Sequence, residues 1–190
     1  MPDDILMETE RLLLRQWRDE DLDPFADMGT DPEVMRYFPN LMTRAKSVNM
    51  IEIARARTND GGFCFSPIEL RETREFLGFV GLNRPAYRVP LPFDPCVEIG
   101  WRLKRSAWGN GYASEAALAW LRFGFETLDL DEIVSFTTQS NLASQKVMER
   151  IGMGRDRKGD FLHPELAPDH SLAPHVLYRR SRTGWVGASG

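Results

Sequence analysis

The chain has 190 residues, 42% of them hydrophobic and 11% aromatic, and its formal net charge at pH 7 is −4. This length and composition predict one compact domain over residues 1–190, with a core from about 8 to 180 and a tail at 181–190. The net negative charge argues against a nucleic-acid partner, and no apolar run approaches the roughly 18 residues of a membrane helix. The acidic start lacks an apolar segment behind it, so we expect a cytoplasmic protein that binds neither nucleic acid nor membranes.

The first half of the chain mixes strand and helix patterns. Residues 11–17 and the runs 63–70 and 76–82 predict strands, the last two joined as a hairpin by a polar turn. Helices are predicted after Asp19 or Asp21, from Asp31-Pro32, and over 43–58. The proline-rich stretch 84–95 is expected to be a functional or mobile loop. Cys64 and Cys96 lack metal spacing, so they are expected to be buried reduced thiols, with no bound metal.

The second half has a more regular pattern. A strand is predicted at 97–103, with Val97, Ile99, Trp101 and Leu103 on one face and Glu98, Gly100 and Arg102 on the other. A helix follows with a buried stripe of Ala113, Ala116, Ala117, Trp120, Leu121 and Gly124. Further on we expect a strand at 133–138, a helix at 141–150 with Ala143, Val147 and Ile151 facing inward, and a last strand at 175–178. This mixed order predicts an α/β or α+β fold.

Gly109 and Gly111 stand between the strand at 97–103 and the helix that follows it. Glycines there allow a tight turn and a close approach of a ligand, and the helix start offers N–H groups that favour an anion. Lys104 and Arg105 are expected to add positive charge. The chain lacks the Gly-Lys-Ser/Thr ending of a P-loop, which argues against an NTPase. It also lacks the third glycine of a dinucleotide-binding motif, which argues against a nicotinamide enzyme. An ordinary strand-to-helix turn explains the glycine pair equally well at this point.

Several segments, in order along the chain, carry a family resemblance: ETERLLLR (8–15), FLGFVGL (76–82), EIGWRL (98–103), WGNGYASEA (108–116), NLAS (141–144) and RIGM (150–153). Over roughly residues 8–180 they resemble the GNAT superfamily of acetyl-CoA-dependent N-acetyltransferases, most closely its RimJ/RimL-type branch. Trp108 stands where many members have Gln or Arg, a departure common in that branch. The resemblance implies a mixed, mostly antiparallel central sheet of about seven strands, helices on both faces, and a splayed strand pair that holds acyl-CoA.

The resemblance also implies how acetyl-CoA, the co-substrate, binds. Main-chain N–H groups from Gly109 to Ala113 would hold its pyrophosphate, and the edge of the strand at 101–103 would pair with its pantetheine arm. The alternative for that edge is ordinary sheet pairing. The expected cofactor-binding residues are Trp101, Arg102, Leu103, Trp108, Gly109, Asn110, Gly111, Tyr112, Ala113, Asn141 and Ser144.

Glu98, Ser144 and Asn141 are the candidate catalytic residues. Glu98 lies in an apolar strand, where desolvation would raise its pKa and let it accept a proton from the amine. An ion pair with an arginine across the sheet is the alternative. The position at which many relatives have a proton-donating tyrosine is Met148, so the resemblance assigns proton donation to Ser144 and a bond to the cofactor arm to Asn141. The alternative is that Asn141 or Ser140 caps the helix and Ser144 faces solvent.

His163 is a candidate substrate contact, because its segment borders the acceptor site in the family's topology. The leading interpretation is an N-acetyltransferase that moves an acetyl group directly to a primary amine of a small molecule or a protein N-terminus. A sensor or regulatory module that binds acyl-CoA without turnover is the alternative. The exposed sheet edges are compatible with a monomer or a homodimer.

Overall fold

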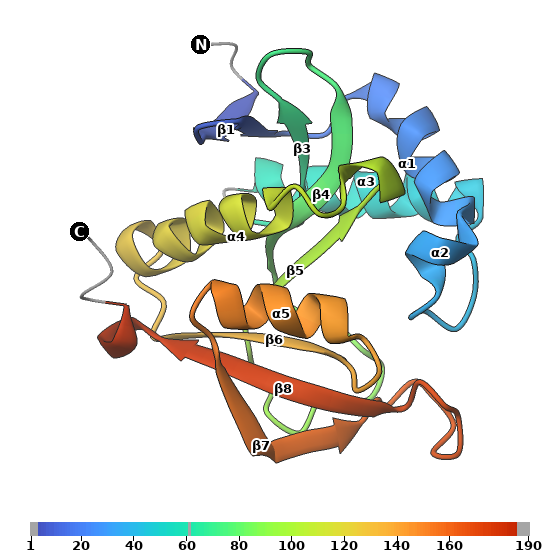
Figure 1. The fold of residues 1–190 in the computed structure, drawn as a ribbon, viewed down its shortest axis with the longest axis vertical. Coiled ribbons are helices and arrows are strands. Elements are labelled where there is room, and N and C mark those ends of the chain that lie inside the picture. Colours follow the sequence, from blue (N-terminus) through green and yellow to red (C-terminus); the bar gives the residue numbers. More distant parts are fainter. Residues whose placement is uncertain (1–3, 61, 186–190) are drawn as a thin grey trace.

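The computed structural model describes residues 4–60 and 62–185, which form an eight-stranded sheet with helices on both faces (Figure 1). The strand order is β1-β2-β3-β4-β5-β6-β8-β7. All neighbours pair antiparallel except β5 and β6, which are parallel. The strands are β1 (Ile5–Glu8), β2 (Leu12–Arg15), β3 (Ser66–Leu70), β4 (Phe76–Asn83), β5 (Glu98–Leu103), β6 (Glu132–Thr138), β7 (Gly154–Leu162) and β8 (Pro174–Ser181). The fold class predicted from the sequence is confirmed.

The helices divide between two hydrophobic clusters, one on each face of the sheet. They are α1 (Leu22–Thr30), α2 (Pro32–Met35), α3 (Arg44–Asn59), α4 (Tyr112–Arg122) and α5 (Leu142–Arg150). One cluster contains Trp120 of α4 and Met148 of α5, and the other contains Phe25 of α1. β4 contributes Val80 to the first and Phe79 to the second, because successive strand residues point to opposite faces.

Two strands were not expected from the sequence. β1 and β7 lie at the two edges of the sheet, which therefore has eight strands rather than about seven. The nine residues of β7, GRDRKGDFL, are mostly polar and none is buried, so they carry no alternating apolar pattern. Edge strands have one unpaired side and can remain polar, which hides them from a reading of hydrophobic periodicity.

The inward face of α5 also differs from the expected one. Met148 and Ile151 are buried, whereas Ala143 is exposed and Val147 only partly covered. The stripe predicted for α4 is confirmed, since Ala116, Ala117, Trp120, Leu121 and Gly124 are all buried and Ala113 is partly buried. Both cysteines are free thiols, Cys64 buried and Cys96 partly buried.

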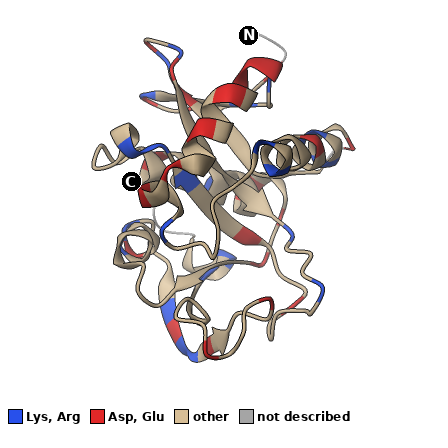
Figure 2. Cartoon of the chain, turned by 90° about the vertical axis from the view of Figure 1, so that its right-hand side faces the viewer, with Lys and Arg blue, Asp and Glu red and all other residues tan. Residues whose placement is uncertain are grey.

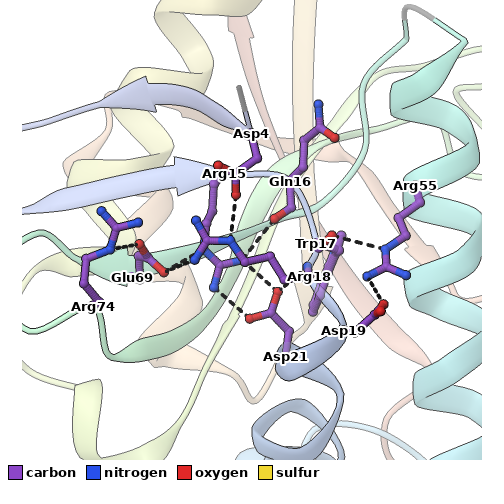
Figure 3. A network of polar contacts seen from close by, with 10 residues as sticks. All are labelled: Asp4, Arg15, Gln16, Trp17, Arg18, Asp19, Asp21, Arg55, Glu69 and Arg74. Carbon is purple, nitrogen blue, oxygen red and sulfur yellow. Dashed lines mark hydrogen bonds and ion pairs between the residues drawn. The ribbon is translucent and has the colours of Figure 1, made fainter. Parts of the chain in front are cut away.

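A buried ion network joins β2 to β3 and to the turn before α1 (Figure 3). Arg15, with a side chain 2% exposed, donates from Nη1 and Nη2 to Asp21 at 2.7 Å each and from Nε to Glu69 at 2.6 Å. Arg18 and Arg74 approach Glu69 from the rim. Removing one partner of such a buried pair leaves an uncompensated charge, which typically costs about 3–5 kcal/mol. The network therefore holds β2, β3 and the start of α1 in register.

Charges of both signs are interspersed along the chain, as Figure 2 shows, so neither sign dominates the face in view. None of the helices in the described ranges is both long and apolar enough to span a membrane.

Candidate active site

The two parallel strands β5 and β6 separate soon after they begin. Among the described residues, they pair at a single register position, Glu98 with Val134. There the N–H of Val134 donates to Val97 O at 2.9 Å, and Ser135 Oγ donates to Ile99 O at 2.8 Å. In the described residues no pairing between the two strands follows, and they diverge toward the side where α4 and α5 begin (Figure 1). The result is a V-shaped gap in the backbone pairing of the sheet, with the N-termini of α4 and α5 at its wide end.

The main chain of Trp101 points into this gap. In an antiparallel ladder, successive residues bond alternately toward and away from the partner strand. The N–H of Lys104 donates to Leu77 O of β4 at 2.9 Å, so the groups of Trp101 and Leu103 point the other way, toward β6. The main chain of Arg102, which was expected to bind the cofactor, points to β4 like that of Lys104 and is therefore turned away from the gap. The indole Nε1 of Trp108 donates to the Leu103 carbonyl at 2.9 Å and thereby occupies it. Trp101 is thus the strand residue whose N–H and carbonyl are both left to pair with an extended arm in the gap.

The glycine turn lies at the mouth, where β5 leads into α4. Gly109 and Gly111 have φ values of +78° and +81°, a conformation that favours glycine, and Gly111 is the N-cap of α4. A Cβ added to Gly109 would meet no atom within 4 Å. Open space therefore lies against a helix start whose N–H groups have no partner within the helix. This geometry fits a diphosphate.

Arg11 holds the cradle in place, a role that the sequence did not reveal. Its Nη1 donates to Asn110 O at 2.9 Å, and its Nε donates to Glu115 Oε2 at 2.7 Å. Its guanidinium lies 4.8 Å from the ring centroid of Tyr112. Thr9 Oγ1 also donates to Glu115, at 2.6 Å. The N-terminal residues thus brace the loop and neutralise a carboxylate beside the proposed anion site.

Lys104 does not add charge to the cradle as expected. Its Nζ pairs with Glu75 in the turn between β3 and β4. Arg105, in the 3-10 turn Arg105–Ala107, is exposed. An anion at this loop would therefore meet the main-chain N–H groups rather than the charge of this lysine.

Asn141 caps α5 and orients Ser144. Its Oδ1 accepts from the N–H of Ser144 at 3.2 Å, as an N-cap does. Its Nδ2 donates to Ser144 Oγ and to Thr137 Oγ1, each at 3.0 Å. Ser144 Oγ is thus an acceptor in this bond, and its own proton is free to point elsewhere. Both residues lie at the start of α5, on the β6 side of the gap, and Met148 is buried one turn further on.

Glu98 begins β5 at the vertex of the V. Its Oε1 accepts from Asn83 Nδ2 at 2.8 Å, and the Oδ1 of Asn83 accepts in turn from Arg57. Burial is the largest influence on this carboxyl and raises its pKa to about 7, although the bond from Asn83 opposes the rise. Its partner is an amide rather than an arginine, so the carboxyl can change charge near neutral pH.

His163 lies in the loop between β7 and β8, against the loop that precedes β5. Its ring is 4.8 Å from the ring of Tyr87 and 4.9 Å from that of His175. Burial lowers the pKa of His163 and lowers that of His175 to about 4. Burial, and next the negative charge of Glu98, raise the pKa of Tyr87. The structure therefore places His163 against Tyr87, in the loop that leads to the strand of Glu98.

The described residues contain no group of three or more His, Cys, Asp or Glu side chains arranged to hold a metal ion. The site consists of the gap, the glycine turn at the start of α4 and one carboxyl with a pKa near neutrality.

Comparison with known proteins assigns this arrangement to a class. A family model described as an acetyltransferase (GNAT) domain matches residues 11–154. The chain is 31% identical over 152 residues to the "Uncharacterized N-acetyltransferase YnaD" of Bacillus subtilis (strain 168), covering 78% of this chain and 82% of that protein. The structure of a GNAT-family acetyltransferase from Bacillus anthracis matches with a TM-score of 0.74 at 27% identity, covering 93% of this chain and 98% of that one.

A second similar structure is described with ligands present. Spermidine N-acetyltransferase from Vibrio cholerae, in complex with CoA and spermine, matches with a TM-score of 0.70 at 16% identity over 93% of this chain and 99% of that one. The present chain belongs to the GNAT acetyltransferase family. It is an N-acetyltransferase, and the activity of its family is acyl transfer from acetyl-CoA.

Proposed function

We propose that this enzyme moves an acetyl group directly from acetyl-CoA to a primary amine of a small molecule or of a protein N-terminus. The observation that carries the proposal is the V-shaped gap with the glycine cradle at its mouth and Glu98 at its vertex. The motif segments that resemble the RimJ/RimL-type branch support placing the enzyme there.

Binding follows from the main chain. The N–H groups from Gly109 to Ala113 would hold the pyrophosphate, as helix starts do for anions. The main-chain N–H and carbonyl of Trp101 would pair with the amides of the pantetheine arm, as a strand edge pairs with a peptide. Asn141, already held by its cap bond, would bond to the same arm from the β6 side.

Glu98 would accept the proton that the amine must lose. When bound, acetyl-CoA supplies an acetyl thioester, to which the amine nitrogen bonds while the carbon–sulfur bond breaks. With a pKa of about 7, roughly half of the Glu98 carboxyls are ionised at neutral pH. Such a group is well matched to general base catalysis. Ser144, whose hydroxyl proton is not used by Asn141, would protonate the departing sulfur.

The partner and its contacts complete the proposal. His163 would contact the acceptor at the Glu98 end of the gap. The protein would act as a monomer or a homodimer. The acceptor itself has to be found by assay.

The experiment measures free thiol release from acetyl-CoA with a panel of amines and short peptides, and confirms the acetylated product by mass spectrometry. We expect thiol release that depends on the acceptor. Tight binding of acetyl-CoA without acceptor-dependent thiol release would replace the transferase proposal with the sensor.

A further inference from the structure

Arg102 of β5 is a partly buried cation, and no carboxylate of the described chain pairs with it. Within the described ranges no Asp or Glu oxygen lies within 4.0 Å of its nitrogens, and its buried Nε makes no hydrogen bond. Its Nη1 reaches the sulfur of Met42 at 3.1 Å, a weak acceptor. Burial lowers the pKa of Arg102 to about 10, so the side chain still carries its charge at neutral pH.

Aromatic rings surround this guanidinium. Its carbon lies 4.1 Å from the ring centroid of Phe38 and 5.4 Å from that of Phe79. Such contacts stabilise a cation, but by less than the removal of a charge from water costs. Phe38 is 40% exposed, so the charge lies beside an opening rather than in a closed core. The rings support the guanidinium but do not offset its charge.

Arg102 and Glu98 occupy the same face of β5. Alternate residues of a strand share a face, and a rise of about 3.3 Å per residue places their Cα atoms about 13 Å apart. Gly100 lies between them, and a Cβ added there would come within 3.1 Å of the Phe65 ring. The ring centroids of Phe65 and Phe79 are 5.2 Å apart, and the two rings make the surface between Glu98 and Arg102 apolar.

We propose that Arg102 binds an anionic group, a carboxylate in the first instance, that the acceptor carries several bonds away from its amine. The acceptor would place its amine toward Glu98, its apolar middle over Phe65 and its anion on the guanidinium. The inference rests on the proposed function, because that function places the acceptor in the gap between β5 and β6. It narrows the substrate class to amines that carry an acidic group.

The first test measures binding and needs no turnover. N-acetylated ω-amino acids of increasing chain length, each paired with its carboxamide, are added to the protein with saturating CoA. We expect the free acids to raise the melting temperature more than their carboxamides at one or more chain lengths. In Arg102→Met this difference disappears, while in the control Arg44→Met, a 59% exposed side chain paired with Asp23, it remains.

The second test measures turnover with the corresponding amines. If Arg102 and the acceptor's anion form a hydrogen-bonded charge pair, Arg102→Met should raise KM for the acidic acceptor by about 10- to 100-fold. The same variant should change kcat/KM for the matching carboxamide by less than about twofold. Arg102→Lys keeps the charge but loses the planar fork, so it should fall between these values. Aminoalkyl phosphonates extend the panel, and a preference for them would identify phosphate rather than carboxylate as the anion.

The outcomes separate the two proposals. If CoA does not bind or no amine is acetylated, the proposed function fails. If amines are acetylated without preference for an acidic group, or if Arg102→Met weakens binding of CoA itself, the assignment of Arg102 is wrong. Because Arg102→Met removes a desolvated cation, its melting temperature should not fall. A large fall, with unchanged discrimination, would assign the side chain to packing, and Arg102→Lys provides the measurement if the methionine variant does not fold.

Discussion

The replacement Glu98→Gln tests the base directly, because glutamine keeps the size of the side chain and its hydrogen bond with Asn83 but cannot take up the proton. The raised pKa of Glu98, about 7, arises from burial. The pH profile of kcat/KM reports the ionisation of essential groups in the free enzyme. We therefore expect a rising limb centred near pH 7 in the wild type and none from this group in the variant.

The size of the effect follows from the ionised fraction. With a pKa of about 7, about 10% of Glu98 is ionised at pH 6 and about 90% at pH 8. Wild-type kcat/KM should thus rise about tenfold across this range through Glu98 alone. General base catalysis contributes typically about 100- to 10,000-fold, so at pH 8 the variant should lose at least about 100-fold.

The assay follows thiol release with an acceptor whose amine pKa lies below 6, so that the amine's own titration does not add a second limb. Glu52→Gln, an exposed glutamate on α3, is the matched control and should retain the wild-type profile. An unchanged limb and rate in Glu98→Gln would refute the assignment of Glu98 as base.

The other predictions concern stability, the cradle and the start of α5. Asp21→Asn should lower the free energy of unfolding, measured with urea, by about 3–5 kcal/mol, because it leaves Arg15 partly unpaired in the core. The control Asp23→Asn, in an exposed pair with Arg44, should change this free energy by less than about 1 kcal/mol. Equal losses in the two variants would contradict a structural role for the buried network. Gly109→Val should lower the free energy of unfolding by about 1–2 kcal/mol, because residue 109 has a positive φ. It should also weaken acetyl-CoA binding in calorimetry at least about tenfold, since the added atoms enter the open space at the cradle. Unchanged affinity would place the diphosphate elsewhere. Ser144→Ala should lower kcat with little loss of stability. Asn141→Ala should lower kcat and also lower the free energy of unfolding by about 1 kcal/mol, because α5 loses its N-cap. Full turnover in Ser144→Ala would exclude Ser144 as the proton donor. Because folding raises the pKa of Glu98 from 4.5 to about 7, the folded state binds its proton more tightly, so the wild type should lose stability as pH rises from about 4.5 to 7, and Glu98→Gln should lack this loss.

Much of the fold could be predicted from the sequence because the central elements are buried. The strand at 97–103 and the stripe on α4 alternate with periods of two and 3.6, and both form as expected. The positive φ of Gly109 and Gly111 likewise follows from the residue type. β7 was missed because an edge strand can be polar throughout.

The site was harder to predict where it depends on contacts between distant residues. Arg11 braces Asn110 across 99 positions, and nothing local to either residue indicates this bond. Lys104 was expected near the cradle from its place in the sequence, but the hairpin turn offers it Glu75. Glu98 could be singled out from its apolar strand, whereas its partner Asn83 follows only from the register of β4 against β5.

The central claim is that the main chain around Gly109 to Ala113 holds a diphosphate and so places a thioester beside Glu98. Titration calorimetry with acetyl-CoA and with S-acetylpantetheine, which lacks the diphosphate, measures this most directly. We expect saturable heat for acetyl-CoA and an affinity lower by at least about 100-fold for the shorter thioester. Equal affinities, or no heat with either ligand at millimolar concentration, would contradict the account.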